Sequence, residues 1–227
     1  SKRRRMQDGL CRCIPIRRGY LRLYSFLSWR EERMPVCNNG SKIYKQLGKL
    51  DLEKECADAL ISDGCVLISQ HADTTGAPTA CEAAGVPCVG YNIDMTSVAP
   101  NTALTSASMD WGVYYTYAVQ CMLDGTAIDT DWCKGFSDGA DKITPLNEKV
   151  VAEGTDEKVK EVEDALADGS LHVFDTSTFT VDGKELTTYK KDGSDTEYVS
   201  DGYFHESEYG SAPAFDVAID GITSITE

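Results

Sequence analysis

The chain has 227 residues, of which 41% are hydrophobic and 26% are charged, and its formal net charge at pH 7 is -15. A chain of this length can bury a core as one or two domains, and it is too hydrophobic to be generally disordered. It contains no apolar run of the roughly 18 residues that a membrane-spanning helix needs. Because phosphate binding requires clustered Lys and Arg, the excess of acid argues against nucleic acid or an anionic membrane as the main partner.

Residues 1–34 differ in charge from the rest of the chain. They carry nine arginines, one lysine and three acids, whereas residues 35–227 carry twelve lysines, 34 acids and no arginine. The first segment also follows neither a helical nor a strand-like hydrophobic period. Three interpretations stay open: a basic arm for nucleic acid or lipid, a targeting peptide, and a stretch that is not native protein sequence.

Helices and strands alternate from residue 51 onward. The predicted elements are a helix over 51–62 capped by Asp51, a strand over 65–69, a helix over 76–84 ended by Gly85, a strand over 87–91, a strand over 103–106 and a helix over 111–123. Strands that alternate with helices at this spacing are typical of βαβ units. The sequence therefore predicts an α/β fold with a parallel sheet and flanking helices.

The last third of the chain has a different character. Thr155 is expected to cap a helix that Gly169 ends. Asp182-Gly183 predicts a type I′ turn that joins strands over 174–181 and 184–189 into a hairpin. The polar stretch 192–213 is expected to be mostly loop, and residues 215–225 alternate as a final strand.

Three polar segments follow predicted strands, at 70–76, 92–95 and 106–111. In open α/β sheets, ligands bind beyond the carboxyl ends of the strands, so we expect these segments to lie together at one edge. Neutral polar groups with aromatic neighbours suit a small heterocycle better than a phosphate. The alternative is that Asp73, Thr74, Ser108 and Asp110 are helix caps. The candidate ligand-binding residues are His71, Asp73, Thr74, Asn92, Asp94, Ser106, Met109, Asp110, Trp111 and Tyr114.

Catalytic and metal motifs are not evident in the sequence. We find no GxSxG elbow, Walker loop or HExxH, and no CxxC pair among the nine cysteines. We therefore expect no catalytic residues, metal or cofactor, although His71 with Asp73 could form half of an acid–base pair. The six cysteines after residue 50 mostly fall on predicted core faces, which is typical of buried free thiols in a reducing or anaerobic setting.

The body of the chain resembles the basic membrane protein (BMP, PnrA-like) family of ABC-transporter substrate-binding lipoproteins. The segments that carry the resemblance are LEKECADALISDG (52–64), ISQHADTTG (68–76), VGYNIDM (89–95), LTSASMDWGVYYTYAVQCMLDGT (104–126), DGSLHVFDTSTFTVDGKEL (168–186) and GYFHESEYGSAPAFDVAIDGI (202–222). The resemblance implies a type I periplasmic-binding-protein fold of two α/β lobes, with the ligand in the cleft. Family members bind purine nucleosides or bases and pass them to a membrane permease and ATPase. It thus implies an extracytoplasmic lipoprotein, not an enzyme, and we expect a monomer that binds no nucleic acid.

The resemblance implies only part of the family's ligand set. Met109 stands where nucleoside-binding members have a lysine that bonds the ribose, so a free base or another small heterocycle becomes as good a candidate as a nucleoside. The positions that match the family are His71, Asp73 and Thr74 in the loop facing the cleft, Asn92 and Asp94 at a strand end, and the pair Thr105-Ser106.

The family begins with a strand and an Asp-Asn loop that we do not find here, so we expect an incomplete copy with an incomplete first lobe. Allowed codons for Cys11–Trp29, when read one nucleotide later, can give VGAYPYAEVISGYTAFFLG, which resembles the family sequence before residue 52. We hypothesise that residues 1–48 are a frameshifted translation and that residues 49–227 form a PnrA-like substrate-binding domain. Two other functions stay open: an α/β enzyme using His71 and Asp73, and a binding module whose arm is residues 1–34.

Overall fold

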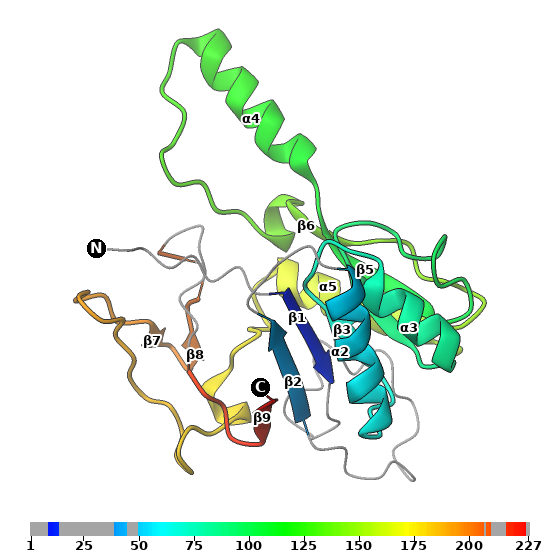
Figure 1. The fold of residues 1–227 in the computed structure, drawn as a ribbon. Coiled ribbons are helices and arrows are strands. Elements are labelled where there is room, and N and C mark those ends of the chain that lie inside the picture. The colour runs from blue at the N-terminus through cyan, green and yellow to red at the C-terminus, as the bar shows by residue number, and fades with distance from the viewer. Residues whose placement is uncertain (1–8, 14–38, 45–49, 207, 210–216, 226–227) are drawn as a thin grey trace.

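One mixed sheet organises the chain in the computed structural model, which describes residues 9–13, 39–44, 50–206, 208–209 and 217–225 (Figure 1). Within these residues the sheet has seven strands in the order β6-β5-β4-β3-β1-β2-β9. The strands are β1 (Gly9–Cys13), β2 (Asn39–Tyr44), β3 (Ile68–Gln70), β4 (Cys88–Tyr91), β5 (Ala103–Met109), β6 (Asp141–Ile143) and β9 (Ile222–Ile225).

The middle of the sheet is a parallel α/β unit, as the alternation of elements predicts. Strand β3 pairs in parallel with β4, and β4 pairs in parallel with β5. Helix α3 (Gly76–Ala84) connects β3 to β4 and ends at Gly85, whose left-handed backbone lets its N–H reach the last carbonyls of the helix. The α/β fold class is therefore confirmed, although β1 and β6 add antiparallel pairings at either side.

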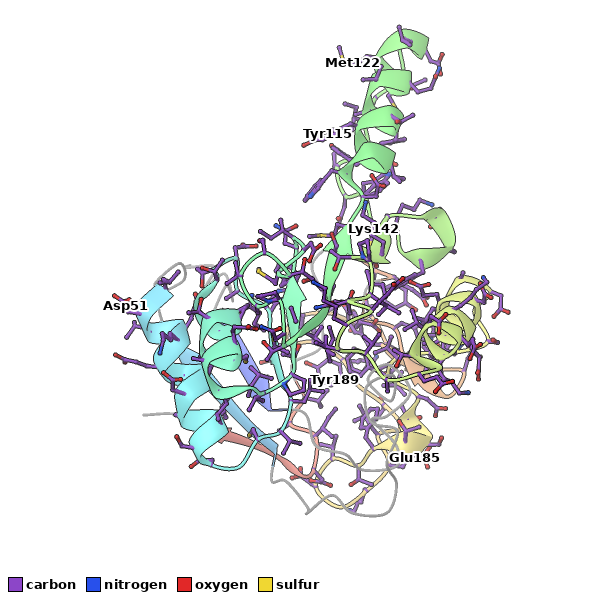
Figure 2. All side chains as sticks on the ribbon, turned by 90° about the vertical axis from the view of Figure 1, so that its right-hand side faces the viewer. Asp51, Tyr115, Met122, Lys142, Glu185 and Tyr189 are labelled. Carbon is purple, nitrogen blue, oxygen red and sulfur yellow. The ribbon has the colours of Figure 1, made fainter. Side chains whose placement is uncertain are left out.

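Helices lie on both sides of this sheet. Helices α2 (Leu50–Ser62) and α3 cover one side, and α5 (Thr155–Ala167) lies on the other, as the two views together show (Figures 1 and 2). The core between α2, α3 and the strands is made of small and medium apolar side chains. Its buried members include Cys56, Ala57, Leu60, Ile68, Ala80, Cys81, Cys88 and Met95.

Several predicted boundaries differ from the structure for local reasons. Asp51 lies inside the first turn of α2 rather than capping it, because the helix already begins at Leu50. Strand β5 continues to Met109, well beyond the predicted end at Ser106, because β6 pairs with residues 107–109. The cap of α5 is Gly154, and Thr155 is the first helical residue.

The predicted hairpin around Asp182-Gly183 is right in its turn and wrong in its strands. Both turn residues have positive φ, and the N–H and C=O groups of Val181 and Lys184 pair across the turn. The residues before the turn do not form a strand, because Thr176–Thr178 is a short 3-10 helix, η3, that begins after Asp175. The backbone of 174–176 pairs instead with residues 202–204.

A second small hairpin occurs where the sequence predicted mostly loop. Strands β7 (Val199–Ser200) and β8 (Tyr203–Phe204) pair in antiparallel fashion across Asp201-Gly202, and both turn residues have positive φ. This is the same Asp-Gly signal as at 182–183, followed here by strands too short to show alternation. Phe204 is fully buried in a surrounding group of aromatic rings that includes Tyr189 and Tyr198.

Two strands fall within the segment assigned to a frameshift. Strand β1 pairs with β3, and β2 pairs with both β1 and β9. Most of residues 1–48 lie outside the described residues, so the frameshift hypothesis and the proposed domain boundary stay predictions.

Cys65 is disulfide-bonded, so the interpretation of all six later cysteines as free thiols is wrong at this position. The other five, at 56, 81, 88, 121 and 133, form no disulfide. Across the described residues, the structure offers no helix that combines the length and the apolar character needed to cross a membrane.

Candidate functional site

The three polar segments meet at one edge of the sheet, at the carboxyl ends of β3, β4 and β5. Asn92 joins them: its Nδ2 donates to Asp73 Oδ1 at 3.3 Å, and its carbonyl accepts a hydrogen bond from Ser108 Oγ at 2.8 Å. The N–H of Asn92 donates to the carbonyl of Ala107 at 2.7 Å. The predicted juxtaposition of these segments is therefore confirmed, and it follows from the parallel pairing of the three strands.

An aromatic pair flanks these polar groups. The rings of His71 and Tyr91 lie 4.3 Å apart between centroids and are tilted by 56°. Desolvation raises the pKa of the Tyr91 phenol, and the charges of Asp73 and Asp141 raise it further. Tyr91 therefore stays protonated and can both donate and accept a hydrogen bond. Tyr91 is not among the candidates predicted from the sequence, because it is the last residue of a predicted strand.

Thr74 forms its hydrogen bonds to other residues of the protein. Its hydroxyl donates to the carboxylate of Glu53, a residue of α2 that is 2% exposed, and accepts from the N–H of Gly76 at 3.2 Å. Gln70 Nε2 donates to the Thr74 carbonyl at 3.0 Å. These bonds fix the loop that carries His71 and Asp73 to the start of α3. The N-cap of α3 is Thr75, so the alternative that Asp73 or Thr74 caps this helix is wrong.

Asp94 and Ser106 take different positions from the residues around Asn92. Asp94 is exposed, and its Oδ1 accepts from the N–H of Thr96 at 2.8 Å, which closes its own turn. Ser106 is fully buried, beside Gly90 and Met95. Among the described residues its hydroxyl has no hydrogen-bond partner. Ser106 therefore has no open face at the site, whereas the exposed Asp94 has no bond to Asn92, Asp73 or Ser108 in the hydrogen bonds that join the three segments.

Asp110 is the N-cap of α4 (Trp111–Asp124). Its Oδ1 accepts from the N–H of Gly112 at 2.9 Å, and its Oδ2 forms an ion pair with Lys142 Nζ at 3.1 Å. The bond from Lys142 and the backbone bond from Gly112 lower the pKa of Asp110. Lys142 was missed because β6 was not predicted. The half-buried Met109 lies beside Asp141, its partner across β5 and β6.

The two candidate aromatic residues of α4 lie along the helix. Trp111 is 55% exposed and stacks on Tyr115, with centroids 6.3 Å apart. Tyr114 packs edge-on against Trp132 at 5.2 Å, in the segment that returns from α4. Of the candidates, the structure thus joins His71, Asp73 and Asn92 directly, together with Tyr91 and Ser108; we call these five residues the strand-end site.

The charges around the strand-end site are mostly acidic. Asp73 and Asp141 both act on Tyr91, and desolvation raises the pKa of Asp141. Lys142 is already paired with Asp110. Across the part of the chain that the structure describes, no group of three or more His, Cys, Asp or Glu side chains could hold a metal ion. The site can therefore accept and donate hydrogen bonds and offer ring faces, but it provides little attraction for an anion.

Comparison with known proteins identifies the family. The family described as ABC transporter substrate-binding protein PnrA-like (Bmp) matches residues 40–170, which is more than half of the chain and includes the whole strand-end site. The chain belongs to this family. PnrA-like proteins are substrate-binding proteins rather than enzymes, which favours a binding function over the α/β enzyme considered above.

Two relatives carry names that bear on the ligand. A purine-binding protein of Brucella abortus is 32% identical over 59% of this chain and 37% of its own length. A protein of Haloferax volcanii, named "Putative ABC transporter glucose-binding protein TsgA13", is 29% identical over 59% of this chain and 34% of its own length. The match thus spans about a third of either relative. An ABC transporter solute-binding protein from Conexibacter woesei superposes with a TM-score of 0.42 at 22% identity, over 56% of this chain and 43% of that one.

Proposed function

We propose that this PnrA-like chain binds a purine base or nucleoside at the strand-end site and serves an ABC importer. The observation that carries the proposal is the bonding of three strand-end segments through Asn92, beside the ring pair of His71 and Tyr91. The purine-binding relative from Brucella abortus supports the choice of ligand. The partners of such a protein would be the permease and the ATPase of the same transporter.

The chemistry of the site suits an uncharged heterocycle. A purine edge carries both donors and acceptors, which the Asp73 carboxylate, the Asn92 amide and the Ser108 hydroxyl can match. The rings of His71 and Tyr91 offer apolar faces for stacking. A nucleotide phosphate would meet Asp73 and Asp141, which repel it. Met109 provides no ammonium group for a ribose, so the free base is the ligand that these side chains favour.

The family also bears on where the chain works. Substrate-binding proteins of ABC importers act outside the cytoplasm, and we propose the same location here, with anchoring by a lipid.

Calorimetry on the full chain tests the proposed ligand. Adenine, guanine, adenosine, guanosine, a purine nucleotide and glucose are titrated in turn; glucose is included because of the relative from Haloferax volcanii. We expect heat from a purine base or nucleoside and none from the nucleotide or glucose. Binding of glucose without any purine would replace the proposal with a sugar-binding function.

Two matched variants test where the ligand binds. Asp73→Asn removes a charged acceptor at the carboxyl end of β3, whereas Asp63→Asn makes the same change in an exposed turn before the other end of β3. Charged hydrogen bonds contribute roughly 1.5–3 kcal/mol, so Asp73→Asn should weaken purine binding about tenfold or more. Asp63→Asn should bind as the unchanged chain does. Equal binding by the two variants would contradict the site.

A further inference from the structure

The hydrogen bonds within the strand-end site leave its polar side chains with more acceptors than donors. The exposed Asp73 has a carboxylate that only accepts, and its Oδ1 takes one hydrogen of the Asn92 amide at 3.3 Å. Ser108 donates its single hydroxyl proton to the Asn92 carbonyl at 2.8 Å, so its oxygen can only accept from a ligand. Among the described residues, the amide nitrogen of Asn92 makes this one bond, which leaves its second hydrogen for a ligand.

The side chains of Asp73 and Asn92 therefore present a defined pattern to a ligand. The two oxygens of a carboxylate offer about four acceptor positions, so Asp73 can receive two further donors while it keeps the bond from Asn92. The remaining N–H of Asn92 lies beside Oδ1 of Asp73, because the same nitrogen already donates to that oxygen. The pattern along these two residues is two neighbouring acceptors followed by a donor.

The purine bases match this pattern to different degrees. Guanine presents its 2-amino group and N1–H as neighbouring donors, followed by O6 as an acceptor. Hypoxanthine lacks the 2-amino donor, and adenine presents N1 as an acceptor beside its 6-amino group. Guanine can thus engage both oxygens of Asp73 and the N–H of Asn92, whereas each of the other two bases leaves one carboxylate oxygen without a donor from the ligand.

The charges around the strand-end site favour the same edge of the base. Asp73 and Asp141 both act on the phenol of Tyr91, and Lys142 is paired with Asp110. The hydrogens on N1 and on the 2-amino group of guanine carry partial positive charge, so acidic surroundings attract them. The lone pair on N1 of adenine carries partial negative charge and is repelled.

We propose that the strand-end site selects 2-amino-6-oxopurines, of which guanine is the simplest, through a bidentate contact of Asp73 with N1–H and the 2-amino group. This inference rests on the proposed function, because it takes a purine as the ligand. Hydrogen bonds to a charged group are roughly twice as strong as neutral ones, and a ligand that lacks one of the donors leaves its acceptor unpaired. Asp73 and Asn92 are then the residues that determine specificity.

Calorimetry on the full chain with the 9-methyl derivatives of guanine, hypoxanthine and adenine tests the selectivity. The methyl group gives the three bases the same substituent and keeps a sugar out of the comparison. We expect 9-methylguanine to bind about tenfold or more tightly than either of the others. In Asp73→Asn one acceptor becomes an NH₂ donor that faces the donors of guanine, so the three affinities should lie within about threefold of one another. Asp63→Asn should keep the selectivity of the unchanged chain.

The possible results distinguish this inference from the proposed function. Equal binding of the three bases, tighter binding of 9-methyladenine, or a guanine preference that survives in Asp73→Asn would overturn the selectivity and leave a purine site in place. Failure of all three to bind would also overturn the selectivity. It would overturn the proposed function as well if none of adenine, guanine, adenosine and guanosine binds. The comparison in the unchanged chain needs no substitution, so it decides the question even if Asp73→Asn does not fold.

Discussion

Asn92 is the residue on which the strand-end site depends most. Its side-chain amide reaches Asp73, its carbonyl accepts from Ser108, and its N–H bonds to β5. The backbone at this position has a φ of 70°, in the left-handed region that Asn tolerates better than most residues. The residue type therefore serves both the turn and the hydrogen bonds at the site.

Two substitutions separate these roles of Asn92. Asn92→Gly keeps the left-handed backbone and removes the amide, so it should retain stability and weaken purine binding about tenfold. Asn92→Ala removes the amide and also strains the backbone, which should lower the free energy of unfolding by about 1–2 kcal/mol. Urea unfolding and calorimetry on both variants measure the two effects. Unchanged ligand affinity in Asn92→Gly would remove the amide from the site.

Ser106 belongs to the pair Thr105-Ser106 that matches the family, and a substitution there tests whether its hydroxyl contacts the ligand in this chain. Its hydroxyl is fully buried and unpaired among the described residues, so Ser106→Ala should leave binding unchanged and raise the free energy of unfolding by up to about 1 kcal/mol. Thr144→Val is the contrasting variant, because Thr144 Oγ1 accepts from the Ser106 N–H at 2.8 Å. That change should lower the free energy of unfolding by about 1 kcal/mol in urea. Loss of ligand affinity in Ser106→Ala would show instead that the hydroxyl reaches the ligand.

At the scale of elements, helices α2 and α3 depend on a close approach that only glycine permits. A Cβ on Gly76 would collide with the backbone carbonyl of Leu50. Gly76→Ala should therefore lower the free energy of unfolding by about 1–3 kcal/mol, although alanine favours helices. The control is Thr79→Ala, at an exposed position of α3. Gly85→Ala would not serve, because the positive φ of Gly85 would add backbone strain of its own. Denaturant unfolding that ranks the two variants equally would contradict the observed packing of α2 on α3.

The start of α4 gives a pH dependence with a defined sign. Lys142 and the N–H of Gly112 hold the pKa of Asp110 below its ordinary value of 3.8. The stabilisation by Asp110 is therefore present above that value and is lost as the pH falls through the folded-state pKa. Asp110→Asn keeps a capping oxygen without the charge. The stability difference between the unchanged chain and Asp110→Asn, from urea unfolding, should shrink as the pH falls from about 5 to 3. A difference that grows toward low pH would contradict the lowered pKa.

Local signals predicted those elements that local interactions determine. Helix α3 and strand β4 were predicted to within one residue, because Gly85 ends the helix and a short apolar run follows it. The length of β5 could not be predicted, since it depends on pairing with β6, which is 32 to 36 residues away in sequence. The turn at Asp182-Gly183 was predictable from two residues, but its flanking strands were not, because residues 174–176 pair with 202–204 instead.

The candidate site was likewise predictable only in part from the sequence. The meeting of three strand ends follows from parallel topology and was predictable from the order of elements. Tyr91 and Lys142 were missed because their roles depend on tertiary neighbours: Tyr91 through His71, and Lys142 through Asp110. Burial of Ser106 likewise depends on Gly90 and Met95, which are remote from it in sequence.

At the scale of the whole molecule, the described residues form a PnrA-like α/β body from which helix α4 projects (Figures 1 and 2). The family match covers the strand-end site, where we propose that a small ligand binds.

A titration of the isotope-labelled chain with a purine base, followed by amide nuclear magnetic resonance, tests the central claim most directly. We expect the amide signals of residues 71–74, 91–94 and 107–110 to shift together with one saturation curve. Signals from α5, on the other side of the sheet, should stay in place. Saturable shifts confined to other segments, or no shift with any purine, would contradict the placement of a purine site at the ends of β3, β4 and β5.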